Sequence, residues 1–228
     1  MSNGPTIGIL QERSLHASLK DLYMTDDASA EVSVDGFVVD VVRNGLLIEI
    51  QTRNFAAIKG KLGSLFKNHP VRLVYPLPNK KWIVKQTPDG EKQLSRRLSP
   101  KRCRFEDIFN ELVRIPNFIA HSNFSLEVLL IEEEEIRHQD GKGSWRRRGW
   151  SIVDRKLIEI IDRRLYEKPS DFLHFIPDSL EKPFRNSDLV EALGISRRLG
   201  QKLTYCLRKM NALKTVGKKG NSLLHDIV

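Results

Sequence analysis

The stretch DVVRNGLLIEIQT, residues 40–52, sets two carboxylates and a glutamine inside one of the most apolar runs of the chain. At its centre, Asn44 and Gly45 give the strongest short-range signal for a β-hairpin, because a type I′ turn needs positive φ at both central residues and these two tolerate it. A two-residue turn places Asp40 opposite Glu49. The sequence therefore predicts a direct cross-strand pair of carboxylates.

This pair is unfavourable in a purely structural hairpin, because like charges directly opposite each other repel at Cβ separations of roughly 4.5–5.5 Å. Two-residue alternation places Gln51 on the face of Glu49, and both faces are mainly apolar, as in a sheet covered on both sides. The opposite face is predicted to carry Val39, Val41, Ile48 and Ile50. A divalent cation such as Mg²⁺ or Mn²⁺ would make the pair favourable. The alternative is that the strands splay and both acids are solvated.

Hydrophobic spacing predicts the elements around this hairpin. They are a helix over 9–23, strands over 31–42 and 46–52, a helix over 54–68 capped by Asn54 and closed before Pro70, and a strand over 71–76.

This order of elements, with Asp40 on one strand and Glu49-Ile50-Gln51 on the next, resembles the core of the PD-(D/E)XK nuclease superfamily over residues 9–77. The signature of that superfamily is an Asp followed on the next strand by Glu-x-Lys. The resemblance implies phosphodiester hydrolysis with Mg²⁺ (or Mn²⁺) bound by Asp40 and Glu49. An acidic residue on the first helix often joins the site in the family, and Glu12 is the candidate.

Gln51 departs from this signature, because the family lysine orients or activates the attacking water, whereas an amide hydrogen-bonds water without positive charge. Some superfamily members carry Glu-x-Gln, so the resemblance implies that Gln51 places water. Lys59, next to Ile58 on the predicted helix, is a candidate for the missing ammonium, although a solvated surface lysine is the simpler interpretation. The metal would polarise the phosphate and lower the pKa of water.

Residues 78–150 are interpreted as an extension of the nuclease-like domain 1–150. KKWIVKQ reads as a strand, FEDIFNELVRI as a helix and FSLEVLLIEEEEIRH as a long strand. Alternation sends the side chains of Glu132–Glu135 to both faces, so a solvated strand end is a better interpretation than a set of metal ligands. The basic runs RRLSPKR and WRRRGW are either phosphate contacts or, more commonly for such runs, solvated surface.

Positive charge is concentrated in the C-terminal third. The formal net charge is +9, and residues 145–228 hold 18 Lys and Arg against 10 Asp and Glu, whereas residues 1–144 hold 20 against 19. Residues 151–167 are predicted to form a connecting helix, with Val153, Leu157, Ile160 and Ile161 on one face. The asymmetry favours a polyanion as partner of the region beyond.

In residues 168–228, two short helices are joined by a turn that contains Gly194, and a hairpin with a basic tip around Lys218 and Lys219 follows. This arrangement resembles the winged-helix family. The resemblance implies duplex DNA as partner, with protein contacts as the alternative use of such a domain. The predicted DNA-binding residues are Arg197, Arg198, Gln201, Lys202, Arg208, Lys218 and Lys219.

The predicted fold class is therefore α/β (α+β): a restriction-endonuclease-like mixed sheet flanked by helices, plus a small C-terminal winged helix-turn-helix domain. The predicted function is a metal-dependent endodeoxyribonuclease. A catalytically inactive DNA-binding regulator or adaptor is the alternative, and an RNA-processing nuclease is a third. Many nucleases of this class dimerise, so the resemblance is also compatible with a homodimer.

Composition also limits the cellular location and the kinds of site that are expected. No apolar run is long enough for a membrane-spanning helix, and the N-terminus lacks the pattern of a signal peptide, so we expect a cytoplasmic protein without a membrane partner. Cys103 and Cys206 are isolated and are interpreted as buried hydrophobes. The histidines lack the spacing of zinc ligands.

Overall fold

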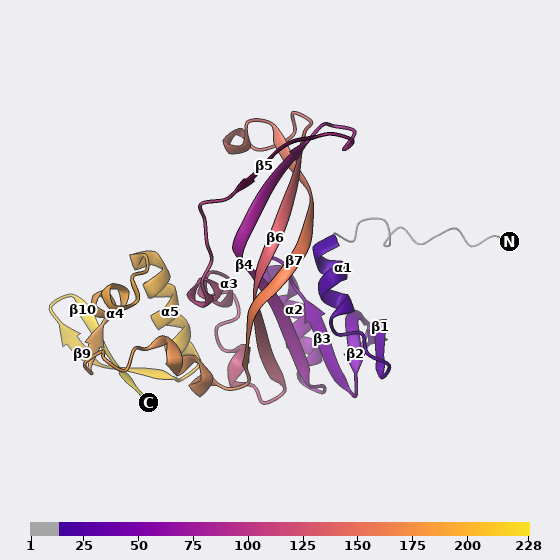
Figure 1. Cartoon of the computed structure of the whole chain (residues 1–228). Coiled ribbons are helices and arrows are strands. Elements are labelled where there is room, and N and C mark those ends of the chain that lie inside the picture. The colour runs from indigo at the N-terminus through magenta and orange to yellow at the C-terminus, as the bar shows by residue number, and fades with distance from the viewer. Residues whose placement is uncertain (1–13) are drawn as a thin grey trace.

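A computed structural model describes residues 14–228 of the chain (Figure 1). Within them, the chain forms a mixed α/β structure whose larger sheet has seven strands in the order β1-β2-β3-β4-β6-β7, with β5 paired to β4. The mixed sheet flanked by helices is as predicted. The strands are β1 (Ala28–Val34), β2 (Phe37–Arg43), β3 (Leu46–Ile50), β4 (Val71–Gln86), β5 (Gln93–Leu98), β6 (Phe124–Gln139) and β7 (Trp150–Tyr166).

Helices cover both faces of this sheet. On one face, α1 (Ser14–Asp21) packs Leu15 and Leu19 into one buried apolar cluster. On the other face, α2 (Phe55–Leu65) and α3 (Phe109–Leu112) belong to a second, larger cluster. Short 3₁₀ segments complete this region: η2 (Phe105–Ile108), η3 (Phe118–Ala120), η4 (Trp145–Arg147) and η5 (Pro169–Phe175).

The β2–β3 hairpin forms as predicted. Asn44 and Gly45 have φ values of 49° and 78°, and Val41 pairs with Ile48 in the antiparallel register. On its other side β3 pairs in parallel with β4, so it is an interior strand. The prediction of a single strand over 31–42 was wrong, because a second turn of the same kind at Asp35-Gly36 divides it into β1 and β2.

Strand β2 changes face at Asp40. The β1–β2 ladder pairs Ala30 with Val41 and Val32 with Val39 but skips Glu31 and Asp40, and Glu31 has a left-handed φ of 54°. Val39 packs in the cluster of α2, whereas Val41 packs in the cluster of α1. The prediction that Val39 and Val41 share a face was therefore wrong, because regular alternation does not continue through this distortion.

Helix α2 begins one residue after the predicted cap. Asn54 has a left-handed φ of 57° and makes no side-chain cap, contrary to prediction. Instead, Oε2 of Glu111 accepts a hydrogen bond of 3.0 Å from the backbone N–H of Phe55. A carboxylate at a helix N-terminus is favourable because it satisfies a free donor and complements the helix dipole. Here that group comes from a distant part of the chain.

Three long strands form an arm that extends beyond the helices (Figure 1). The predicted strands 71–76 and 80–86 are one continuous strand, β4, which includes Pro76 and Pro78. It pairs in parallel with β6 from Val71 to Gln86, with a register shift between Pro78 and Lys80. The long strand predicted at β6 is confirmed.

The prediction of a connecting helix over 151–167 was wrong: these residues form most of β7, which pairs with β6 along its length. The helical spacing of apolar residues was misleading, because most of the apolar residues in this segment are β-branched and pairing with β6 decides its conformation. Register shifts leave Val153, Ile158 and Ile161 outside the ladder as β-bulges, and all three are exposed.

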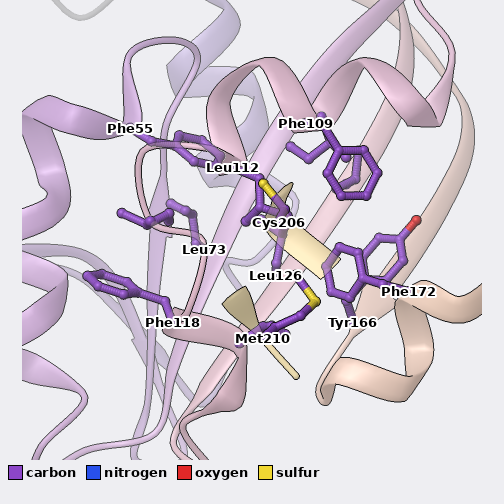
Figure 2. Close-up of a cluster of buried hydrophobic side chains, with 14 of the residues drawn as sticks. Phe55, Leu73, Phe109, Leu112, Phe118, Leu126, Tyr166, Phe172, Cys206 and Met210 are labelled. Atoms are coloured by element: carbon purple, nitrogen blue, oxygen red, sulfur yellow. The ribbon is translucent and has the colours of Figure 1, made fainter. Parts of the chain in front are cut away.

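The C-terminal region contains the predicted pair of helices and hairpin. Helices α4 (Asn186–Leu193) and α5 (Arg197–Lys209) precede a small sheet in the order β8-β10-β9. Its strands are β8 (Phe184–Arg185), β9 (Leu213–Lys219) and β10 (Ser222–Ile227). Cys206 and Met210 join Phe109, Leu112 and Tyr166 in one cluster (Figure 2). The two regions therefore share a continuous apolar core.

Two glycines within helices make a matched test of this packing. An added Cβ at Gly200 would lie 2.3 Å from Cγ2 of Val190 on α4, whereas nothing lies within 4 Å at Gly60 on α2. We expect Gly200→Ala to lower the free energy of unfolding by roughly 1–3 kcal/mol through overpacking. Gly60→Ala should raise it by roughly 0.5–1 kcal/mol through helix propensity. Urea denaturation of both variants checks the pair, and equal effects would contradict the close α4–α5 contact.

Candidate functional site

Asp40 and Glu49 come together at the β2–β3 hairpin. The Asp40 side chain is 23% exposed, and its Oδ2 accepts a 2.8 Å hydrogen bond from the backbone N–H of Ile50. The Glu49 side chain is only 2% exposed, since β3 is interior and covered on both faces. One partly exposed and one buried carboxylate thus lie on adjacent strands.

Lys61 supplies positive charge to this pair. Its Nζ lies 2.5 Å from Oε1 of Glu49 and also donates a 2.5 Å hydrogen bond to the carbonyl of Val38. Lys59, the lysine singled out from the sequence, is exposed. The structure therefore brings Lys61, two residues further along α2, to the carboxylates instead of Lys59.

The two carboxyl groups differ in acidity. Burial, and after it the negative charge of Asp40, raises the pKa of Glu49 to about 7, although Lys61 opposes the shift. Burial also disfavours ionisation of Asp40, but its hydrogen bonds with His16 and with Ile50 N–H outweigh this and lower its pKa. Near neutral pH the site therefore combines an ionised Asp40 with a Glu49 that is part protonated, unless more positive charge arrives.

His16 is a site residue that the sequence reasoning missed. Its Nε2 lies 3.4 Å from Oδ2 of Asp40, and it is placed there by α1, whose Leu15 and Leu19 are buried against the sheet. Its position directly after Leu15 on a helix facing the hairpin was the available signal. Glu12, the predicted acidic residue of this helix, lies outside the described residues.

Gln51 follows β3 and faces the turn into α2. Its Nε2 donates hydrogen bonds to the backbone carbonyls of Arg53 and Asn54, the latter at 3.2 Å. The amide nitrogen is thus committed to this turn, and the amide oxygen is the part of Gln51 suited to contact a water molecule.

The residues present fit a divalent cation with two protein carboxylates. Within residues 14–228 no group of three or more His, Cys, Asp or Glu gathers as a metal site. Oε1 of Glu49 is buried and makes no hydrogen bond beyond its ion-pair contact with Lys61. Mg²⁺ commonly takes one or two carboxylates and completes its shell with water and substrate phosphate. Asp40 and Glu49 could hold it in that way.

The acidic run of β6 forms internal ion pairs. Glu133 and Glu135 are buried, and Nζ of Lys81 lies 2.9 Å from one carboxylate and 3.1 Å from the other. Glu132 and Glu134 point to other partners, as alternation predicts: Glu132 pairs with Lys80, and Glu134 pairs with Arg96. The interpretation as a solvated strand end was therefore wrong.

A cavity of about 740 Å³ lies between α4, α5 and β10. Of the predicted DNA-binding residues, it is lined by Arg197, Gln201 and Arg208. Asn186, Ser187, Asn221 and Ser222 add polar groups around it. The concave surface thus combines two guanidinium groups with several hydrogen-bonding side chains.

The other predicted residues of this region lie elsewhere. Arg198, Lys218 and Lys219 are exposed. Lys202 instead donates a 2.7 Å hydrogen bond from Nζ to Oδ1 of Asn110 on α3, so it joins the C-terminal region to the larger sheet's region.

Comparison with known proteins gives a family without an assigned activity. The chain belongs to the family described as "Domain of unknown function (DUF8091)", whose model matches residues 13–167. That match ends just after β7. The chain is also 30% identical over 224 residues to an uncharacterized protein of Treponema pallidum (strain Nichols), covering 96% of this chain and 87% of that protein. No solved structure matches.

Within residues 14–228, no helix is both long enough and apolar enough to cross a membrane.

The raised pKa of Glu49 predicts a pH-dependent stability in EDTA. A carboxyl group with a folded-state pKa of about 7, against an ordinary value of 4.5, stabilises the fold fully below the lower value and loses that contribution as the pH rises through 7. Glu49→Gln replaces the carboxyl group with an amide that stays neutral at every pH. Its stability relative to the parent should therefore be higher at pH 8 than at pH 5, by roughly 2–3 kcal/mol.

Urea denaturation at the two pH values measures this difference. Glu159→Gln, at an exposed position of β7, is the control and should change little. A Glu49→Gln effect that is the same at both pH values would contradict the raised pKa.

Proposed function

We propose that the chain is a Mg²⁺-dependent endodeoxyribonuclease that hydrolyses phosphodiester bonds with a PD-(D/E)XK-like core. The observation that carries the proposal is the buried Glu49 carboxylate, adjacent to Asp40 across the hairpin and contacted by the ammonium of Lys61. Among residues 14–228 one lysine contacts this repelling pair, which leaves a demand for positive charge. A divalent cation, which would also bind the phosphodiester, would meet that demand.

The order of elements supports this assignment. A helix that faces the hairpin, the antiparallel β2–β3 pair, the crossover helix α2 and the parallel strand β4 follow one another as they do in that superfamily. Asp40 and Glu49 occupy the positions of its acidic residues, on successive strands.

Each side chain has a role that its position suits. Mg²⁺, when bound, would supply positive charge for the phosphate and a lowered pKa for water. Asp40 and Glu49 hold it. Lys61 takes the part that a lysine at position 51 would play, holding an ammonium beside the attacking water or the phosphate oxygens. Gln51 orients water through its amide oxygen, and His16 holds Asp40 in place.

The C-terminal region would deliver the duplex as a winged helix. Its two helices and hairpin have the element order of that family, and its cavity presents Arg197, Gln201 and Arg208 beside the hairpin strand β10. Between Arg185 and Gly220 there are nine Lys and Arg against two Asp and Glu. An acidic or neutral exposed face would suit protein contacts better than this basic one, so the surface favours contact with the phosphate backbone.

A second candidate is a DNA-binding regulator or adaptor with an inactive nuclease-like core. The observation in its favour is Gln51, whose amide nitrogen is tied to the α2 turn and which brings no charge to the carboxylates.

Cleavage of supercoiled plasmid in Mg²⁺ and in Mn²⁺ separates the two candidates. We expect Lys61→Ala to slow nicking by about 100-fold or more, as for loss of one group that stabilises the transition-state charge. Lys59→Ala, on the same helix but exposed, should stay within about twofold of the parent. Asp40→Ala and Glu49→Ala should bind DNA like the parent without cutting it.

Two outcomes would count against the nuclease. If the parent does not cut and binds DNA as the variants do, the regulator takes its place. If Lys59→Ala and Lys61→Ala slow cleavage equally, the role given to Lys61 is wrong.

Duplex binding by the C-terminal cavity is tested by its salt dependence. Removal of a phosphate contact with Arg197→Ala should weaken binding to unrelated duplex sequences alike and reduce the slope of log K against log salt by about 1. Lys214→Ala, an exposed lysine of β9 that does not line the cavity, is the matched control. Fluorescence anisotropy in EDTA measures both, and equal slopes would remove the cavity from the proposal.

A further inference from the structure

The loop between β6 and β7, residues 140–149, lies at the end of the arm (Figure 1). Trp145 is 82% exposed, the highest value among the large hydrophobic side chains of the described residues. Neither the carboxylate site nor the C-terminal cavity includes it. Tryptophan is enriched at contact surfaces, because its ring is apolar and its N–H can still find a polar partner.

The backbone of this loop is fixed by hydrogen bonding and close packing. The N–H of Gly141 donates a 3.1 Å hydrogen bond to the carbonyl of Gly149, which closes its base. Gly143 lies against the backbone of Trp150, where an added Cβ would be 2.1 Å from the carbonyl oxygen. Between these points η4 presents Trp145 outward. The indole is therefore held out by a closed turn, which reduces the entropy lost on binding.

Basic residues accompany this indole in the loop. Lys142, Arg146 and Arg148 are exposed, and the guanidinium of Arg146 lies 5.4 Å from the centre of the Trp145 ring. The loop's carboxylate, Asp140, accepts hydrogen bonds from the hydroxyl of Ser151 and the N–H of Lys142. The exposed end of the loop thus has net positive charge around one aromatic face.

We propose that this loop binds unpaired nucleotides, with Trp145 stacking on a base and Lys142, Arg146 and Arg148 contacting the flanking phosphates. Aromatic stacking with basic side chains is the chemistry that recognises single strands, because bases of a duplex have no free face. The inference rests on the nucleic-acid part of the proposed function. It specifies the substrate as DNA with a single-stranded segment next to a duplex.

Charge and composition favour nucleic acid over an anionic membrane surface. Binding at a bilayer interface needs an apolar face of appreciable area. In the segment DGKGSWRRRG, residues 140–149, Trp145 is the single large apolar side chain. One indole among cations suits a base flanked by phosphates better than it suits acyl chains.

The arm loop and the C-terminal region lie at different ends of the molecule (Figure 1). A duplex held in the C-terminal cavity and a single strand held by the loop would therefore be contacted at separate places. Such a pair of contacts distinguishes gapped, flapped or branched DNA from a continuous duplex.

Binding of a fluorescent oligo(dT) and of a blunt duplex by the full chain in EDTA tests the inference. We expect Trp145→Ala to weaken oligo(dT) binding by about tenfold, while duplex binding changes by less than about twofold. Trp145→Phe keeps a stacking ring and should recover most of the affinity. Leu94→Ala removes a side chain of β5 that is 51% exposed on the same arm, and should bind like the parent.

Tryptophan fluorescence gives a second readout. The chain has three Trp, and oligo(dT) should quench part of the parent's emission but not that of Trp145→Phe. Arg146→Ala combined with Arg148→Ala should reduce the salt slope of oligo(dT) binding by about 1.4 at two contacts. Circular dichroism confirms that each variant is folded.

Three results would overturn the inference. Trp145→Ala could bind oligo(dT) like the parent, or it could lose duplex binding to the same extent as oligo(dT). It could also lose binding only to phosphatidylglycerol vesicles, which would make the loop a lipid contact. Since EDTA prevents metal-dependent cleavage, failure here leaves the nuclease test of Asp40, Glu49 and Lys61 unaffected, and the reverse also holds.

Discussion

Burial of the Glu49 carboxylate is the constraint on which the candidate site depends. At the arm, Glu133 and Glu135 are also buried, but Lys81 lies between them and Arg137 contacts Glu135, so two cations balance two acids. At the hairpin, Lys61 serves both Glu49 and Asp40, and His16 adds charge only when it is protonated. Counted over the described residues, the lysine and arginine side chains of the arm network exceed those of the hairpin network by one.

Local chemistry made the hairpin predictable. Asn44 and Gly45 adopt left-handed φ at little cost, so the turn type, the register and the meeting of Asp40 with Glu49 follow from a few neighbouring residues. The same reasoning applied to Asp35-Gly36 would have divided the preceding strand correctly. The two helices and the hairpin of the C-terminal region were likewise predictable, because their caps, turns and apolar stripes are local in sequence.

Features that depend on distant partners could not be predicted in this way. The segment of β7 has apolar residues at helical intervals, and only the 16-residue strand β6 beside it makes the extended form favourable. The N-terminus of α2 is capped by Glu111, which is 56 positions away. Choosing between Lys59 and Lys61 required the rotation of α2 against the sheet, which hydrophobic spacing gives only to within a residue or two.

The bulges of β7 have a consequence for how the chain behaves beside its own copies. Among the described residues no strand pairs with the outer side of β7, a strand of 17 residues, so the backbone groups on this side have no partner in a ladder. A straight strand of that length would be a template for another chain. Val153, Ile158 and Ile161 each interrupt the spacing of those groups. The free side is thereby divided into short, mismatched runs that resist edge-to-edge growth of the sheet into fibres.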